Sequence, residues 1–241
     1  MLRTLVAALC LVANIGAAQD IASHAGLRDA VGRLDMGETG FCTGALVSED
    51  VVLTAAHCLF DKSTGRRFHL DELNYHAGLT EGTNSASSSV AAVFIHPQYQ
   101  SSKKGELSNL PFDLALVKLS QPLLTLTTRT IQVAYPNLSG VPASVLSYGK
   151  GRSGSAKLQN GCSLSPHAQG IILTTCQASS GTSGAPVFQI RNGRPAIVSI
   201  VSAMAKADGT PVSLVVPVAE AIGAMQRGLA SEVTPAFYRS Q

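Results

Sequence analysis

The chain contains 241 residues with a formal net charge of +3 at pH 7, and 14% of its residues are charged. This share is well below the usual level of about 25%, and the densest basic run is Lys103-Lys104. The composition therefore argues against a nucleic-acid-binding protein. The length is enough for two compact domains or one large β domain.

Residues 1–18 have the pattern of a signal peptide. Arg3 supplies a positive start, residues 5–15 form an apolar run, and Gly-Ala-Ala precedes a cleavage point before Gln19. A membrane anchor is the alternative, but this run is shorter than the ~20 residues that span a bilayer. We therefore expect a secreted or periplasmic protein that keeps no membrane anchor after cleavage. Cleavage would also remove Cys10.

The rest of the chain is predicted to be mostly β, because short β-type runs alternate with Gly, Pro, Ser and Asn. The predicted strands cover residues 44–48, 51–55, 91–95, 114–119, 144–148, 171–176, 186–190 and 196–203. Residues 82–89 are predicted to be a surface loop. A C-terminal helix is predicted from Pro217 at its first position and from the spacing of the apolar residues Val218, Ile222, Met225 and Leu229.

The first chemical motif is Thr54-Ala55-Ala56-His57-Cys58. Here a histidine ends an apolar strand, beside a cysteine that can tether the backbone and so hold one imidazole in place. Such an imidazole can take a proton from a hydroxyl group. An ordinary, partly buried histidine is the alternative, and it is our interpretation of His24, His69, His76 and His167.

The second motif is an aspartate at the start of an apolar run. Asp113 stands between Phe112 and Leu114, and the run ends at Leu119. A buried carboxylate without donors would be costly, so Asp113 must find hydrogen-bond partners. A structural, salt-bridged Asp is the alternative.

The third motif is Gly181-Thr182-Ser183-Gly184-Ala185-Pro186. The two glycines allow a tight turn that projects the Ser183 hydroxyl, and Pro186 favours an extended Ala185. The motif also resembles the start of a G-x-S-x-G nucleophile elbow. That interpretation fails because position 185 is Ala and because no histidine follows Ser183, as the α/β-hydrolase order would require.

The order His57, Asp113, Ser183 and the residues around them resemble the trypsin/chymotrypsin superfamily of serine proteases, in particular its bacterial exported members. The resemblance implies an all-β fold of two antiparallel six-stranded β-barrels, closed by a C-terminal helix. The first barrel would lie in residues 19–124 and the second in residues 125–241, with the active site between them.

The resemblance also implies roles for the residues of the three motifs. Ser183 would be the nucleophile, His57 the general base, and Asp113 the residue that orients His57. The backbone N–H groups of Gly181 and Ser183 would form the oxyanion hole. Thr182 and Ala185 depart from the usual Gly-Asp-Ser-Gly-Gly-Pro, and neither change removes a catalytic atom.

Four cysteines remain after signal cleavage, and four cysteines permit three pairings. The pairing that closes short loops and matches the family is Cys42–Cys58 and Cys162–Cys176. Zinc ligation is the alternative, but no C-x-x-C or H-x-x-H spacing supports it.

The family's substrate pocket aligns here with Gln177 and with Ser202, Ala203 and Met204. Relatives that cut after Arg or Lys carry an Asp at the position of Gln177, so we expect no strong preference for a basic residue. Relatives activated by cleavage pair a new amino terminus with an Asp just before the nucleophile. Thr182 occupies that position, and the stretch 29–34 is only a weak echo of an Ile-Val-Gly-Gly start.

The function predicted from the sequence is a serine endopeptidase that acts on proteins or peptides through an acyl-enzyme, without a cofactor or metal. The alternatives are a catalytically silent binding protein on the same fold and an esterase-like hydrolase that uses the same triad. The sequence pattern carries no signal for an oligomeric state.

Overall fold

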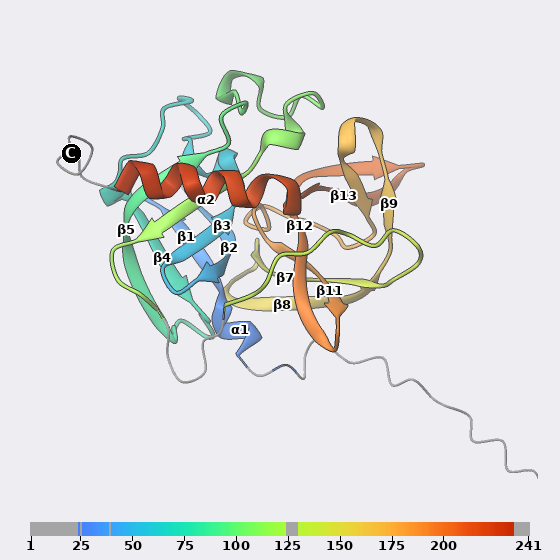
Figure 1. The fold of residues 1–241 in the computed structure, drawn as a ribbon, viewed down its shortest axis with the longest axis horizontal. Coiled ribbons are helices and arrows are strands. Elements are labelled where there is room, and N and C mark those ends of the chain that lie inside the picture. Colours follow the sequence, from blue (N-terminus) through green and yellow to red (C-terminus); the bar gives the residue numbers. More distant parts are fainter. Residues whose placement is uncertain (1–23, 25, 39, 124–129, 234–241) are drawn as a thin grey trace, which may run out of the picture.

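Two antiparallel sheets and a C-terminal helix build the protein in the computed structural model (Figure 1). The structure describes residues 24, 26–38, 40–123 and 130–233. The predicted signal peptide, residues 1–18, and the predicted boundary between the halves at 124/125 fall outside these ranges. Among the described helices, none has both the length and the apolar character needed to cross a membrane.

In the described residues, the first sheet is a closed barrel with the strand order β1-β2-β3-β6-β5-β4. All neighbouring strands are antiparallel, and β1 closes the barrel by pairing with both β2 and β4. The barrel strands are β1 (Val31–Met36), β2 (Gly40–Ser48), β3 (Val51–Thr54), β4 (Leu73–Ala77), β5 (Ala86–Ile95) and β6 (Ala115–Leu119). The short helix α1 (Leu27–Ala30) precedes β1.

Two facing glycines make room for a large side chain inside this barrel. Gly32 and Gly44 pair in register across β1 and β2, and Tyr75 on β4 is fully buried beside them. A Cβ on Gly32 would overlap the Tyr75 ring, and one on Gly44 would overlap Val52. The Tyr75 hydroxyl lies 3.3 Å from the Ala30 carbonyl and 3.2 Å from the Gly44 carbonyl, so its polar end is not left without a partner.

The second sheet has seven strands in the described residues, in the order β8-β7-β11-β12-β13-β10-β9. Its two edge strands, β8 and β9, are consecutive in the chain and are separated by Ser163 alone. Strands β8 and β9 therefore form one nearly continuous segment. Its β8 part pairs with β7 and its β9 part pairs with β10, so the sheet curves back on itself. The strands are β7 (Ala143–Gly149), β8 (Arg152–Cys162), β9 (Leu164–Pro166), β10 (Ile172–Thr174), β11 (Pro186–Arg191), β12 (Arg194–Ala207) and β13 (Thr210–Pro217).

The two sheets share a core and are joined by hydrogen bonds. Phe188 and Ile200 of the second sheet belong to the same cluster of buried side chains as the barrel interior. Tyr148 on β7 donates its backbone N–H to the Thr43 hydroxyl at 3.1 Å and its phenol to the Leu79 carbonyl at 3.1 Å. These two bonds join β7 of the second sheet to the first barrel, and they fix the position of Thr43, which also contacts the site described below.

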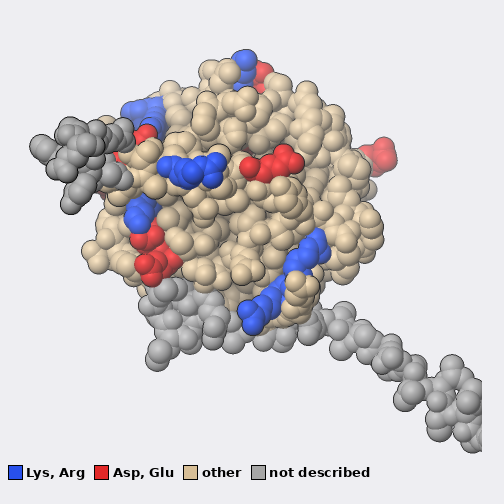
Figure 2. Space-filling model, viewed as in Figure 1, with Lys and Arg blue, Asp and Glu red and all other residues tan. Residues whose placement is uncertain are grey.

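Helix α2 (Ala219–Val233) crosses the molecule and packs against β5 and β6 of the first barrel (Figure 1). Its buried side chains are Met225 and Leu229, and a Cβ on Gly228 would overlap the ring of Phe94 on β5. The face that includes α2 is mostly uncharged, with small groups of charged side chains scattered over it (Figure 2). The low charge content of the sequence is thus visible on this surface.

The structure confirms the predicted all-β class with a C-terminal helix, and it differs from the prediction in detail. Strands β1, β4, β8, β9 and β13 were not predicted, and the six-stranded second barrel appears as the seven-stranded sheet described above. The loop predicted at 82–89 is wrong from Ala86 onward, because that segment pairs with β4. Pro217 ends β13 instead of opening the helix, which begins at Ala219.

Candidate active site

His57 lies in a short buried turn that follows β3. The turn η2 (Ala56–Leu59) is buried throughout, and His57 is 7% exposed. A disulfide joins Cys58 in this turn to Cys42 on β2, with the two Cα atoms 6.2 Å apart. The imidazole is therefore fixed by the end of β3 on one side and by a covalent bridge on the other.

Asp113 contacts His57 in two places. The residue follows the turn η5 (Leu110–Phe112), lies just before β6, and is 2% exposed. Asp113 Oδ1 accepts the backbone N–H of His57 at 2.8 Å, and Oδ2 lies 2.7 Å from His57 Nδ1. An ionised carboxylate can only accept, so Nδ1 carries the hydrogen and the neutral ring keeps a free acceptor at Nε2.

A third donor to Asp113 comes from the second sheet. The hydroxyl of Ser202 on β12 donates to Asp113 Oδ2 at 2.5 Å. Burial by itself raises the pKa of the Asp113 carboxyl. The electrostatic attraction of the neighbouring His57 and the hydrogen bonds from the His57 ring, Ser202 and the His57 backbone outweigh burial and hold that pKa below its ordinary value. Asp113 is thus kept ionised next to the imidazole.

Ser183 lies on a tight loop between the two sheets. Gly181 and Gly184 have φ values of +94° and +76°, which side-chain-bearing residues rarely adopt. A Cβ on Gly181 would overlap the ring of Phe41, and one on Gly184 would overlap Thr54. Both glycines are therefore required by backbone conformation and by close packing, as the sequence motif predicted.

The backbone around Ser183 leaves two N–H groups free. Thr43 fixes the loop through two hydrogen bonds in which it is the donor. Its N–H donates to the Ser183 carbonyl at 2.9 Å, and its hydroxyl donates to the Gly181 carbonyl at 2.8 Å. The N–H groups of Thr182 and Gly184 donate to the Ser179 and Val201 carbonyls. Among the described residues, the N–H groups of Gly181 and Ser183 have no acceptor, which leaves them available to an incoming oxygen atom.

His57, Asp113 and Ser183 line one cavity of about 220 Å³ between the two sheets. Within the described part of the chain, no hydrogen bond joins the Ser183 hydroxyl to His57. Such contacts are often long in an enzyme without substrate and shorten when substrate binds. The structure thus brings together the three residues that the sequence motifs predicted.

The predicted specificity residues lie in different surroundings. Ala203 and Met204 line the cavity, and Met204 is 62% exposed. Ser202 also lines it, but its hydroxyl is occupied by Asp113. Gln177 is not part of the lining: the side chain of Gln159 holds its backbone N–H and C=O at 2.9 and 2.8 Å, outside the cavity. Its place in the lining is taken by Ala178, Ser179 and Ser180.

Both disulfides that the resemblance implied are present, Cys42–Cys58 and Cys162–Cys176. The sulfur atoms of Cys42 and Cys58 lie within 4.8 Å of a His57 nitrogen, but both are bonded to each other and offer no thiolate to a metal. Two bridges in one chain indicate a protein that works outside the reducing cytosol.

Residues 21–223 match the family described as Trypsin. The chain belongs to the trypsin family. Among curated relatives, Trypsin-10 of Gadus morhua is 38% identical over 105 residues, which cover 44% of this chain and 38% of that protein. Trypsin-2 of Salmo salar is 39% identical over 106 residues, covering 44% of this chain and 40% of that protein. The matched segment thus spans less than half the length of either relative.

A solved structure, "Structure of Glu endopeptidase in complex with MPD", superposes with a TM-score of 0.66. It is 19% identical, and the superposition covers 84% of this chain and 91% of that one. At this identity the likeness shows the fold, which is chymotrypsin-like.

In this member of the trypsin family, the stretch 29–34 lies within helix α1 and strand β1. Val31 begins β1, pairs with Ala45 on β2, and accepts the Gly78 N–H through its carbonyl. The residues that weakly resemble Ile-Val-Gly-Gly thus belong to a paired strand of the barrel.

Sequence reasoning missed Thr43, which holds two carbonyls of the Ser183 loop. The signal was present in the sequence: Thr43 is a polar residue beside a cysteine, in a run that the structure shows to be buried. A buried hydroxyl must find partners. The sequence gives no indication that its acceptor, the Gly181 carbonyl, lies 138 residues away.

Proposed function

We propose that the chain is a serine endopeptidase in which Ser183, His57 and Asp113 form the catalytic triad. The observation that carries the proposal is the buried His57–Asp113 pair, in which the imidazole keeps Nε2 free toward the cavity that Ser183 lines. A buried histidine held only for stability would not need an open cavity, a serine and two free backbone N–H groups beside it.

The reaction would follow from these positions. Ser183 Oγ forms a bond to the scissile carbonyl carbon while His57 Nε2 takes its proton, and Asp113 stabilises the resulting imidazolium. The negative charge on the former carbonyl oxygen is stabilised by the N–H groups of Gly181 and Ser183. The C–N bond then breaks, His57 gives the proton to the leaving amine, and an ester to Ser183 remains.

Water would complete the cycle. His57 takes a proton from the water molecule as its oxygen attacks the ester, and the same two N–H groups stabilise the second tetrahedral intermediate. Collapse releases the carboxylic acid product and returns the proton to Ser183. All groups in these steps are supplied by the chain, its substrate and one water molecule.

We further propose that residues 1–18 direct export and are cleaved before Gln19, and that the mature protein works in the periplasm or outside the cell. The two disulfides support an oxidising compartment. Mass spectrometry of the exported protein would find Gln19 at the amino terminus, and an uncleaved chain would contradict the proposal.

A peptide library tests the proposed activity. The purified mature chain should hydrolyse internal peptide bonds, and His57→Ala should lose nearly all of this activity while retaining its fold by circular dichroism. An inactive wild-type protein would favour a catalytically silent binding protein. Cleavage of esters but never of peptides would favour an esterase-like hydrolase.

A further inference from the structure

Two lysines from distant segments line the same cavity as His57 and Ser183. Lys62 lies on the loop that follows the His57 turn, and Lys104 lies just after the turn η4 (Ser101–Lys103). The loop that carries Lys104 joins β5 to β6 and ends at Asp113. Each lysine is therefore carried by a loop attached directly to a member of the proposed triad.

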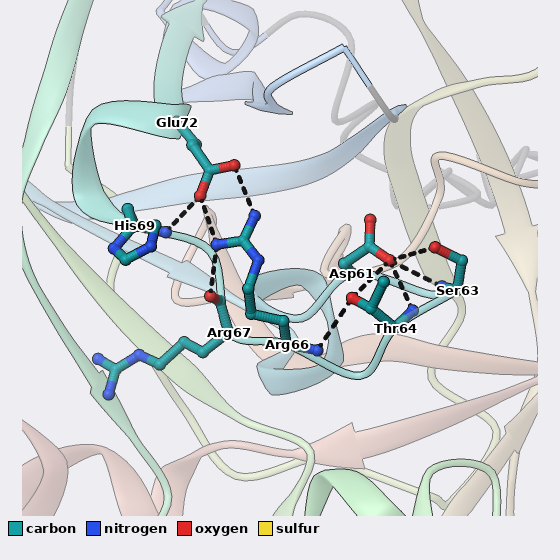
Figure 3. A network of polar contacts seen from close by, with 7 residues as sticks. All are labelled: Asp61, Ser63, Thr64, Arg66, Arg67, His69 and Glu72. Atoms are coloured by element: carbon teal, nitrogen blue, oxygen red, sulfur yellow. Dashed lines mark hydrogen bonds and ion pairs between the residues drawn. The ribbon is translucent and has the colours of Figure 1, made fainter.

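The loop that carries Lys62 is held by its own hydrogen bonds (Figure 3). The Asp61 carboxylate accepts the backbone N–H groups of Ser63 and Thr64, at 2.9 and 2.8 Å, and both of their hydroxyls. The Asp61 N–H donates to the Arg66 carbonyl at 2.8 Å. These bonds, with that of the Ser63 hydroxyl foremost, keep the pKa of Asp61 well below its ordinary value. One oxygen of this carboxylate, Oδ1, is thus held within the turn, and none of the ion pairs among the described residues joins Asp61 to Lys62.

Two further charged side chains of this loop, Arg66 and Glu72, pair with each other. Arg66 binds both carboxylate oxygens of Glu72, at 2.8 and 2.9 Å (Figure 3). Among the charged side chains of this loop, Lys62 is the one that lines the cavity.

The loop that carries Lys104 is fixed from within by Asn109. This side chain is buried, binds both the N–H and C=O of Gln100, at 3.0 and 2.9 Å, and donates to the Lys103 carbonyl at 3.2 Å. Leu110 follows and packs in a cluster with Ala203 and Leu214. The loop thus lies against β12 and β13, on the side of the cavity where Ser202–Met204 would bind the acyl part of a substrate.

The side chains of Lys62 and Lys104 line one cavity, and their ammonium groups are not neutralised by a bound carboxylate in the described residues. Within the described residues, neither amine takes part in an ion pair or hydrogen bond. Partial burial lowers the pKa of Lys104, and the charge of Lys62 lowers it further, while Asp113 opposes the change. The lining contains one acid, Asp113, and both of its oxygens are engaged by His57 and Ser202.

We propose that Lys62 and Lys104 form a subsite for an acidic side chain at P2, the substrate residue just before the one whose carbonyl Ser183 attacks. The proposal rests on the proposed endopeptidase function. A P1 side chain would lie between Ala178–Ser180 and Ser202–Met204. The preceding residue then passes between β12 and the Lys104 loop beside His57, where a carboxylate can meet both ammonium groups.

The test compares two peptides that differ only in Glu or Gln at P2, with the preferred P1 residue in both. Wild type should cleave the Glu peptide with a kcat/KM about three- to tenfold higher, as expected for partly exposed charge pairs. Lys62→Gln and Lys104→Gln should each reduce this Glu/Gln ratio about threefold, and the double variant should bring it close to one.

Lys103→Gln is the matched control. It removes the same charge from the same loop, but Lys103 does not line the cavity, so the Glu/Gln ratio should stay at the wild-type value. The wild-type ratio should also shrink as the salt concentration rises from about 0.02 M to about 0.5 M, because ions screen exposed charges.

Four results would overturn the proposal. An equal kcat/KM for both peptides in wild type contradicts the subsite alone, as does a Glu preference that survives in the double variant. A loss of the preference in Lys103→Gln as large as in Lys104→Gln would show that the positive charge of the whole loop attracts the substrate, without a subsite formed by Lys62 and Lys104. Cleavage of neither peptide by wild type contradicts the endopeptidase function itself, and the subsite with it.

Discussion

The Thr182 hydroxyl accepts a hydrogen bond from the backbone N–H of Ser179, 3.1 Å away, which ties together the loop that carries Ser183. Thr182 is 1% exposed, and its Oγ also lies 3.3 Å from the Tyr148 carbonyl and 3.4 Å from Arg152 Nη2. In trypsin-type zymogens an Asp at this position pairs with a new amino terminus. Here a neutral hydroxyl with local partners occupies the position.

Thr182→Val should therefore lower kcat/KM about tenfold or more. The substitution keeps the shape of the side chain but leaves the part-buried Ser179 N–H without its acceptor, at a cost of about 1 kcal/mol. The loop and its two N–H donors would lose their fixed position. Steady-state kinetics on a peptide substrate measures the effect, and Thr175→Val, an exposed threonine that bonds Ser163, is the control.

The complementary change leaves the loop intact and blocks the amino terminus. An acetyl group or an extra residue before Gln19 should not alter kcat/KM, because the Ser183 loop needs no buried ammonium group. A hundredfold loss, equivalent to about 2.7 kcal/mol, together with an unaffected Thr182→Val, would show that the terminus activates the enzyme.

The acid stability of the protein should depend on Asp113. Its pKa is lower in the folded chain than the value of about 3.9 expected when unfolded. Such a group stabilises the fold above about pH 4, and this stabilisation is lost as the pH falls through the folded pKa. Urea unfolding of wild type and Asp113→Asn measures the difference in free energy of unfolding. That difference should shrink from about pH 6 to about pH 3, and a constant or growing difference would contradict the assignment.

Substrates with Arg or Lys at P1 should have no advantage. The lining contributed by Ala178–Ser180 and Ser202–Met204 contains no acid, and Gln177, at the position of the family's specificity Asp, lies outside it. An unpaired cation in this pocket would lose hydration without gaining a partner. Profiling with a library randomised at P1 checks this, and a profile dominated by Arg or Lys would rule it out.

The sequence was sufficient to single out His57, Asp113 and Ser183, which the structure places around one cavity, because each motif is local: a strand end, an apolar run and a glycine turn. It was not sufficient to predict that Gln177 lies outside the cavity lining, because that position depends on two hydrogen bonds from the Gln159 side chain on β8 to the Gln177 backbone. Strand β8 was missed because most of its side chains are only part-buried and their burial follows no two-residue period. The double role of Ser202 was missed because its contact with Asp113 joins residues 89 positions apart.

The two disulfides should differ in their effect on catalysis. Replacing either pair by Ser should lower the free energy of unfolding by about 3 kcal/mol, since both close loops of similar length. Loss of Cys42–Cys58 should also reduce kcat/KM under conditions where the variant is folded, because Cys58 adjoins His57 in η2. The Cys162–Cys176 variant is the matched control, and an equal loss of kcat/KM in both variants would contradict this role.

The central claim is that Ser183 is the nucleophile, and labelling with a fluorophosphonate probe tests it most directly. The probe should modify Ser183 in the wild-type protein, as shown by mass spectrometry of the labelled peptide. Ser183→Ala should show neither labelling nor hydrolysis of peptides, while Ser180→Ala, a change in the same loop, should retain labelling. Labelling that persists in Ser183→Ala would place the nucleophile elsewhere, and a wild-type protein that takes up no label would contradict the proposed catalysis.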